Sequence, residues 1–255
     1  MKKRYFAGAA VAAMILTAGM ATTSFADWSQ QNGKWYYYND NNGRLVRNDW
    51  VCSKDAWYYM DYNGVMQTNS LIDDTYYVNE NGVMIKNAWK YINNSRWNES
   101  GWRYFGANGK AYTNGWKQIN DVWYHFTDSV LDIGWVEIDG KIYHLEDSGA
   151  MTTGWRKLAD REDDWGEYWY YFNSSGKLIY DGEMKISGET YIFDHSGRML
   201  TGWVKVGNNW YYMDGSGAMA ATRWIGNYYV TGSGAMATNT WIGSYWVGAD
   251  GNWIP

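Results

Sequence analysis

The chain has 255 residues, a formal net charge of −5 and one cysteine, so it cannot form an intrachain disulfide. It contains no basic cluster beyond its first residues, which argues against nucleic acid and anionic membrane surfaces as partners, because both require clustered Lys and Arg. It holds 19 tryptophans, 24 tyrosines and 6 phenylalanines but only 8 leucines. That inventory argues against a layered α/β core and predicts that aromatic side chains do the packing.

Residues 1–26 are typical of a secretory signal that is removed on export. Residues 2–4 are basic, residues 7–21 are mostly small and apolar, and residues 24–26 have the small-x-small pattern of a cleavage site. A retained membrane anchor is the weaker interpretation, because a span needs about 20 apolar residues. Removal would leave residues 27–255 with 19 basic and 27 acidic side chains and no second candidate span.

The rest of the chain is periodic, which decides the expected architecture. A Gly-x-Met/Leu/Ala unit recurs about every 20 residues, giving about eleven copies with irregular insertions near residues 93–100 and 159–166. The third residue of the unit is Leu45, Met66, Met84, Ala111, Leu131, Met151, Leu178, Met199, Met219 and Met236, and Gly251-Asn252-Trp253 closes the series.

Each copy follows one order of residues: an opening aromatic, a tight-turn pair such as Asn32-Gly33, an aromatic run such as Trp210-Tyr211-Tyr212, and a polar turn ending in glycine. Aromatic segments that flank such a pair predict a β-hairpin. A lone hairpin is marginal in water, but stacked hairpins bury one another's faces. We therefore expect an all-β solenoid of about eleven hairpins over residues 27–255.

The hairpin register places specific rings together. If Gly207-Asn208 is the two-residue loop, Lys205 lies opposite Trp210 and Trp203 lies opposite Tyr212. Because side chains alternate along a strand, Trp203, Trp210 and Tyr212 share one face and the intervening tyrosine lies on the other. The same seven-residue interval separates Trp28 from Trp35, Trp50 from Trp57, and Trp116 from Trp123.

If one aromatic face of each hairpin builds the solenoid interior, the role of the rings on the second face has three interpretations. Both faces can be structural. Rings can instead form a cage for a quaternary ammonium group, which donates no hydrogen bond and is held by dispersion and by the negative faces of π systems. Rings can also form a platform on which sugars stack, with Asp, Asn and Gln side chains bonding the hydroxyls.

Units such as GWVKVGNNWYYMDGSGAMAAT and GWKQINDVWYHFTDSVLDIG resemble the choline-binding or cell-wall-binding repeats of Gram-positive surface proteins. The repeats of bacterial glucan-binding proteins and clostridial toxins are similar to them. The resemblance covers residues 27–255 and implies ligand sites between consecutive hairpins. Each site would combine the opening and second-strand tryptophans of one repeat with the third aromatic of the next repeat's strand.

Carried over by position, this pattern is complete or nearly complete at four interfaces. The predicted ligand-binding sets are Trp28, Trp35 and Tyr59; Trp50, Trp57 and Tyr77; Trp203, Trp210 and Tyr229; and Trp116 with Trp123, where His144 takes the third place. The pattern decays at Glu183, Ile142, Thr190 and Ile192, the last of which stands where the set after Trp155 and Trp169 needs a ring. Only a minority of interfaces is therefore expected to bind ligand.

The sequence offers no candidate catalytic or metal cluster. Its three histidines, His125, His144 and His195, are dispersed. Carboxylates recur before glycine turns, where they bond to the turn backbone, and an acidic run is expected to be a solvated loop. The first group is Asp61, Asp147, Asp194 and Asp214, and the acidic run is residues 160–164.

The resulting hypothesis is an exported, non-catalytic, cofactor-free protein that attaches to the cell wall by caging choline on teichoic-type polymers. Two alternatives stay open: a module that binds glucan or another wall polysaccharide, and a structural spacer or adhesin with a protein partner.

Overall fold

The computed structural model describes residues 27–39, 42–93, 100–162 and 166–255. The predicted signal segment lies outside these residues. The chain divides into two compact units. The first comprises Met1–Asn87 and Phe105–Lys110, and the second comprises Ala88–Tyr104 and Ala111–Pro255.

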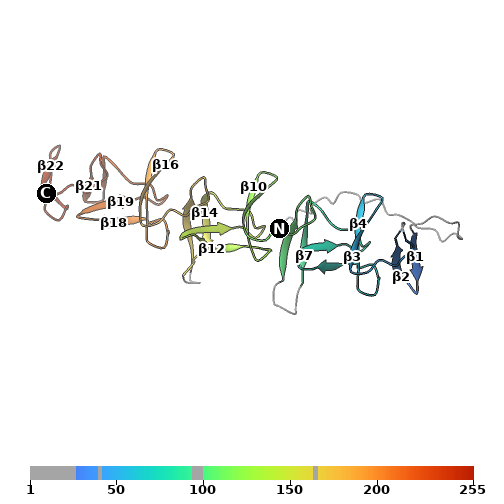
Figure 1. Ribbon diagram of the computed structural model, residues 1–255. Coiled ribbons are helices and arrows are strands. Elements are labelled where there is room, and N and C mark those ends of the chain that lie inside the picture. The colour runs from blue at the N-terminus through green and yellow to red at the C-terminus, as the bar shows by residue number, and fades with distance from the viewer. Residues whose placement is uncertain (1–26, 40–41, 94–99, 163–165) are drawn as a thin grey trace. The chain divides into compact units, whose positions relative to one another are not determined.

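The expected all-β repeat fold is confirmed: the described residues form 24 short strands arranged as eleven antiparallel hairpins (Figure 1). The first six hairpins are β1 (Asp27–Gln31) with β2 (Lys34–Tyr38), β3 (Asp49–Ser53) with β4 (Ala56–Met60), β5 (Ser70–Ile72) with β6 (Tyr76–Val78), β7 (Ala88–Ile92) with β8 (Gly101–Phe105), β9 (Gly115–Ile119) with β10 (Val122–Thr127), and β12 (Gly134–Ile138) with β13 (Lys141–Leu145). The others are β14 (Gly154–Ala159) with β15 (Glu167–Phe172), β16 (Gly182–Ile186) with β17 (Glu189–Phe193), β18 (Gly202–Val206) with β19 (Asn209–Met213), β20 (Arg223–Ile225) with β21 (Tyr228–Val230), and β22 (Thr240–Ile242) with β23 (Tyr245–Val247). Two short strands, β11 (Val130–Leu131) and β24 (Trp253–Ile254), extend the fifth and eleventh hairpins.

The hairpin loops have the backbone that the sequence predicts. Asn32 and Gly33 both have positive φ, 50° and 76°, as a type I′ turn requires. Lys54 and Asp55 take the same conformation without a glycine, at 49° and 63°. Because these turns share the right-handed twist of the strands, they join the strands without splaying them apart.

The core of each unit is built largely from residues at the end of the second strand of a hairpin. In ten of the eleven hairpins a residue at or next to this end is almost fully buried, and it commonly forms a β-bridge with the Met or Leu of the Gly-x-Met unit that follows, as Met60 does with Met66 and Phe172 with Leu178. These positions hold Met, Val, Leu and Phe side chains, and a few tyrosines such as Tyr170 are buried beside them. The buried strand-end residues are Met60, Val78, Phe105, Phe126, Leu145, Phe172, Phe193, Met213, Val230 and Val247.

The glycine of each Gly-x-Met unit makes room for the Met or Leu of the preceding unit. A Cβ at Gly82 would lie 2.7 Å from the Met66 sulfur, and Gly82 has a φ of +76°. A Cβ at Gly64 would similarly lie 2.8 Å from Leu45. The spacing of the repeat therefore has a steric basis. The glycine of one copy leaves space that the Met or Leu side chain of the preceding copy fills. We call this series of contacts the Gly–Met ladder.

The acidic run in the 159–166 insertion is not simply a solvated loop. Asp160 is 7% exposed; it accepts a hydrogen bond from the Tyr170 hydroxyl (2.9 Å) and is paired with Arg198. The Ser196 hydroxyl donates to Glu162 (2.8 Å). The start of the insertion is therefore anchored to the turn before Met199. The expectation of a solvated loop was wrong for Asp160, because its partner Arg198 and the Ser196 partner of Glu162 are more than 30 residues away in the sequence. Residues 163–164 of the run lie outside the described residues.

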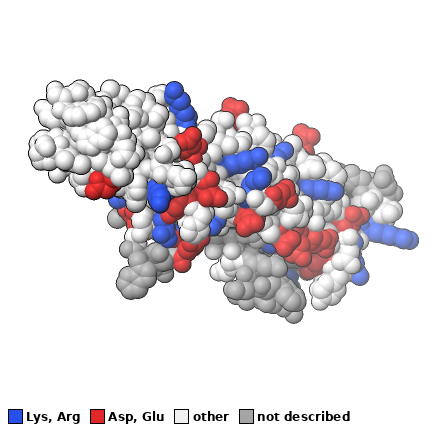
Figure 2. All heavy atoms as spheres, turned by 90° about the vertical axis from the view of Figure 1, so that its left-hand side faces the viewer, with Lys and Arg blue, Asp and Glu red and all other residues white. Residues whose placement is uncertain are grey.

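Figure 2 shows Lys and Arg side chains interspersed with Asp and Glu side chains over the middle and right of the view, whereas the upper left is almost free of charged side chains. Of the residues that the structure describes, none belongs to a helix with the length and apolar character of a membrane span.

The Gly–Met ladder predicts that Gly82→Ala destabilises the fold more than Gly33→Ala. Both glycines have a φ of +76°, so both substitutions carry the left-handed backbone cost of about 1–2 kcal/mol. Only Gly82 would also crowd a neighbour, since nothing lies within 4 Å of a Cβ at Gly33. We expect about 1–3 kcal/mol of additional loss for Gly82→Ala, measured by denaturant unfolding. Equal losses would contradict the ladder.

Candidate functional site

The predicted register of the aromatic hairpins is confirmed. Trp203 lies opposite Tyr212 and Lys205 lies opposite Trp210, so the two tryptophans project from one face of the β18–β19 hairpin. The equivalent pairings hold in the hairpins that carry Trp28, Trp50 and Trp116. We call this the forward face, since it is the face that contacts the next hairpin.

The ring that packs against the opening tryptophan of each predicted interface lies one residue before the third member of the predicted ligand-binding set. Trp28 contacts Tyr58 of the next hairpin, with ring centroids 4.8 Å apart, rather than Tyr59. Tyr59 instead packs on Trp50 within its own hairpin, at 5.3 Å. The reason is strand alternation: Tyr58 lies opposite Val51, on the back face, whereas Tyr59 shares the forward face.

The same one-residue difference holds at the other predicted interfaces. Tyr76 rather than Tyr77 packs against Trp50, and Tyr228 rather than Tyr229 packs against Trp203. Tyr143 rather than His144 packs against Trp116, with ring centroids 4.9 Å apart, so the ring at this contact is a tyrosine and not an imidazole. The displaced residues are placed elsewhere: Tyr77 lies near Phe105, Tyr229 packs on Trp224, and His144 packs on Trp135.

Six interfaces hold an aromatic trio, which we define as the opening and second-strand tryptophans of one hairpin plus the back-face tyrosine of the next hairpin. The trios are Trp28, Trp35 and Tyr58; Trp50, Trp57 and Tyr76; Trp89, Trp102 and Tyr124; Trp116, Trp123 and Tyr143; Trp155, Trp169 and Tyr191; and Trp203, Trp210 and Tyr228. The third and fifth were not predicted from the sequence. The available signal was the tyrosine that directly follows the second-strand tryptophan position, whichever residue occupies that position.

The two tryptophans of a trio differ in burial. The opening tryptophans are half-buried, because each is packed against a tyrosine of the next hairpin and a ring of its own hairpin, which is His125 for Trp116 and a tyrosine for the others. Trp57, Trp123, Trp169 and Trp210 are instead 38–44% exposed, and Trp102 is 48% exposed. Five large indoles at the same repeat position therefore keep much of their surface in water.

The backbone of these exposed tryptophans is fixed by the next repeat. The Met236 amide donates to the Trp210 carbonyl (2.7 Å), and the Met84 amide donates in the same way to Trp57 (2.8 Å). The amides of Met151 and Met199 repeat the contact at the fifth and seventh hairpins. Four of the five exposed rings, those of Trp57, Trp123, Trp169 and Trp210, are thus carried on strands that bond to a methionine of the Gly–Met ladder.

The eighth hairpin lacks a trio, as the sequence predicts. Glu183 lies opposite Ile192 and Lys185 lies opposite Thr190, so its forward face presents no aromatic ring at these positions. This hairpin supplies Tyr191 to the preceding trio but offers no wall for a following one.

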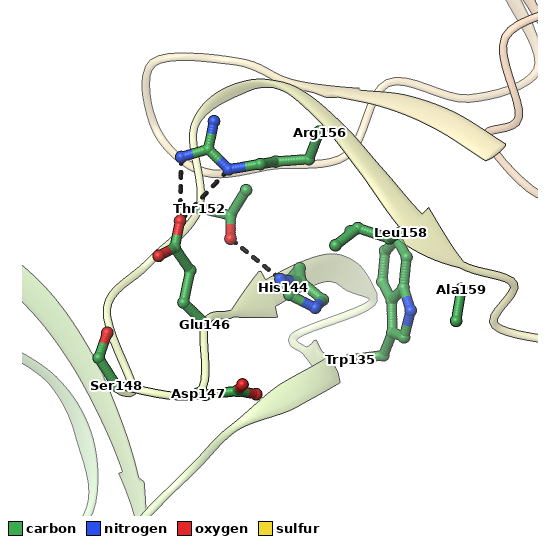
Figure 3. A pocket seen from close by; sticks show the side chains of 9 residues that line it. All are labelled: Trp135, His144, Glu146, Asp147, Ser148, Thr152, Arg156, Leu158 and Ala159. Atoms are coloured by element: carbon green, nitrogen blue, oxygen red, sulfur yellow. Dashed lines mark hydrogen bonds and ion pairs between the residues drawn. The ribbon is translucent and has the colours of Figure 1, made fainter. Parts of the chain in front are cut away.

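The sixth hairpin carries a hollow of about 700 Å³ beside Trp135, which we call the His144 pocket. It is bounded by Trp135, His144, Glu146, Asp147, Thr152 and Arg156, as Figure 3 shows. His144 Nδ1 lies 3.0 Å from the hydroxyl of the buried Thr152, and Arg156 donates to Glu146 at 2.9 Å. Burial lowers the pKa of His144, although Glu146 and Asp147 oppose the shift.

The predicted turn carboxylates are confirmed at three positions. Asp61, Asp194 and Asp214 each accept two backbone amides of the following turn, at 2.8–3.2 Å. Asp147 does not occupy this position: Glu146 does, and it pairs with Arg156 instead. Within the described residues, no group of three or more His, Cys, Asp and Glu side chains is placed to hold a metal ion.

Comparison with known proteins agrees with this architecture. Two choline-binding repeat models match, one at residues 44–84 and 218–253 and the other at residues 180–224. A cell wall binding repeat model matches residues 114–129, 133–151 and 163–178. The chain therefore belongs to the family of proteins built from choline-binding, or cell-wall-binding, repeats.

Two curated relatives and one solved structure illustrate the range of this family. Glucosyltransferase-S of Streptococcus mutans is 30% identical over 184 residues, covering 70% of this chain and 11% of that protein. Glucosyltransferase-I of Streptococcus downei is 27% identical over 125 residues, covering 48% and 8%. The chain thus matches about a tenth of these enzymes. The crystal structure of choline binding protein F from Streptococcus pneumoniae, obtained with a peptidoglycan analogue, aligns with a TM-score of 0.64, 23% identity and coverage of 92% of this chain and 100% of that one.

The lowered pKa of His144 predicts that acidification destabilises the protein. As the pH falls from 7.5 to 5.5, the unfolded state binds a proton at this histidine before the folded state does, so the free energy of unfolding decreases. His144→Gln removes this contribution and makes the decrease shallower. Denaturant unfolding at a series of pH values measures both slopes, and identical slopes would contradict the effect of burial.

Proposed function

We propose that this protein is an exported, non-catalytic wall-binding protein whose aromatic trios cage the choline groups of teichoic-type polymers. The observation that carries the proposal is the exposure of the second-strand tryptophans. Indoles that are 38–48% exposed at one repeated position contribute less to folding than buried rings would, yet the repeat retains them.

The chemistry of a trio suits a quaternary ammonium group. Such a cation cannot donate a hydrogen bond, so its binding energy comes from dispersion and from attraction to ring faces, and tryptophan is the strongest partner. The rings of a trio are already in place: Trp28 lies 6.4 Å from Trp35 and 4.8 Å from Tyr58, between ring centroids. Little ordering entropy then opposes binding.

Six similar trios favour a polymer that carries many copies of one group. Once one group is bound, the tether raises the local concentration of the next, so weak sites combine into avid attachment. The formal charge of −8 for residues 27–255 disfavours a purely anionic ligand at low salt, and zwitterionic choline-bearing units reduce this repulsion.

A second candidate function is binding to a wall polysaccharide or glucan. It is favoured by the repeat similarity to glucosyltransferases of streptococci. Exposed indoles can also stack on pyranose rings, so the trios alone do not separate the two ligands.

Chromatography separates them. We expect retention on a choline-substituted resin in 1 M NaCl, which suppresses simple ion exchange of this acidic chain, and elution by free choline but not by the same concentration of sodium chloride. Retention on cross-linked dextran with indifference to choline would support the polysaccharide function instead. Failure on both resins by the folded protein would overturn both.

The trio assignment predicts which substitutions remove a choline site. Trp210→Ala should weaken choline binding more than Thr190→Ala, since Thr190 occupies the same strand position in the hairpin without a trio. Calorimetric titration of the full chain with choline should lose one binding site for Trp210→Ala and none for Thr190→Ala. Equal titrations of the two folded variants would contradict the assignment.

The correction from Tyr229 to Tyr228 has its own test. Tyr228→Leu should remove the same site as Trp210→Ala, because Tyr228 is the ring against Trp203. Tyr229→Leu alters a ring that packs on Trp224 and should leave that site in place. Tryptophan fluorescence during choline titration gives a second measure of site number. Loss of the site in Tyr229→Leu alone would restore the assignment made from sequence.

A further inference from the structure

The interface after the sixth hairpin is built differently from those that hold a trio. Ile142 occupies the second-strand tryptophan position, opposite Glu137. The back-face ring of the next hairpin, Tyr170, is fully buried, and its hydroxyl is bonded to Asp160. A choline cage of the kind proposed above therefore lacks one wall at this interface.

The His144 pocket lies at this same interface. Figure 3 shows Trp135 with Leu158 and Ala159 on one side of the hollow and Glu146, Asp147 and Ser148 on the other. Its volume of about 700 Å³ lies within the range of small-molecule sites. An apolar wall that includes a half-buried indole thus faces a group of polar side chains across the hollow.

The polar groups of the pocket are held in place by one another. Thr152 has no exposed surface and lies 3.0 Å from His144 Nδ1. Arg156 donates to Glu146 through both Nε (3.3 Å) and Nη2 (2.9 Å). The Glu146–Arg156 pair depends on the glutamate at this repeat position. An aspartate here would bond to the amides of the turn, as Asp61 and Asp214 do.

The charged groups of the pocket leave little net charge for a ligand to complement. Glu146 and Arg156 pair with each other, Asp147 is exposed to solvent, and burial lowers the pKa of His144, which favours its neutral form. An uncharged ligand with hydroxyl groups suits such a site. Carboxylate, guanidinium, imidazole and hydroxyl groups beside one indole provide both donors and acceptors for hydroxyl groups. The apolar face of a pyranose ring complements the indole in the same way.

We propose that the His144 pocket is a binding site for an uncharged saccharide, in which a pyranose stacks on Trp135 and its hydroxyls bond to the Glu146–Arg156 pair. The site is separate from the choline trios in position and in chemistry. It would let the chain engage a glycan strand and a choline-bearing polymer at the same time.

Calorimetric titration of the full chain tests this site with two probes, tetra-N-acetylchitotetraose and isomaltotetraose, each with and without saturating choline. We expect one probe to bind with a Kd that choline changes by less than twofold. Binding of the first probe would identify an amino-sugar glycan as the source of the ligand, and binding of the second would identify a glucan. Binding of neither would overturn the proposal.

Variants on β14 locate the site. Arg156→Ala should weaken saccharide binding about tenfold or more, because it removes a charged hydrogen-bonding group. Lys157→Ala is the matched control: it breaks the comparably exposed Lys157–Glu167 ion pair on the same strand, outside the pocket, and should leave binding within twofold. These exposed residues are used because Trp135 also packs on Tyr170 and Phe172, so that its replacement could unfold the hairpin.

The possible results are distinct. Equal saccharide binding by Arg156→Ala and Lys157→Ala would overturn the proposal, as would competition by choline or loss of saccharide binding in Trp210→Ala. Choline binding is measured separately on the same samples. Failure of the choline trios would therefore leave the saccharide site standing, and the reverse also holds.

Discussion

The structure depends on the alternation of side chains along a two-stranded ribbon. Within each hairpin, alternation sends the two tryptophans to the forward face and the intervening tyrosine to the back face. Each opening tryptophan can then be covered by the back-face tyrosine of the next hairpin, as Trp203 is by Tyr228. A repeat that places rings on both faces thus makes the fold and the candidate sites from the same contacts.

The Gly–Met ladder converts this face-to-face packing into a fixed spacing. Each glycine receives the Met or Leu of the preceding unit, and the amide of the Met bonds to the carbonyl of a second-strand residue in the preceding hairpin. The energy of aromatic stacking alone changes little when a ring shifts slightly. The energies of a close steric contact and of a hydrogen bond change steeply with position. The position of Trp210 is therefore fixed through its backbone, and this contact leaves the indole ring exposed to solvent.

Departures from the repeat pattern mark the places where the chain acquires other properties. The eighth hairpin, which follows the fifth trio, has no aromatic ring at the forward-face positions of Glu183, Lys185, Thr190 and Ile192. The sixth exchanges its second-strand tryptophan for Ile142 and its turn aspartate for Glu146, and the His144 pocket lies there. The insertion that begins after β14 is held by Asp160, whose partners Tyr170 and Arg198 come from two later segments.

The sequence by itself determined the all-β repeat, the hairpin turns and the shared face of paired tryptophans such as Trp203 and Trp210. These features follow from local periodicity, because a two-residue loop and a period of two fix which residues of one ribbon lie together. Only the tertiary structure decided that Tyr58 rather than Tyr59 meets Trp28, since periodicity within one ribbon does not say which face meets the next. The burial of Asp160 and the surroundings of His144 could not be predicted from the sequence either, because both depend on contacts between different repeats.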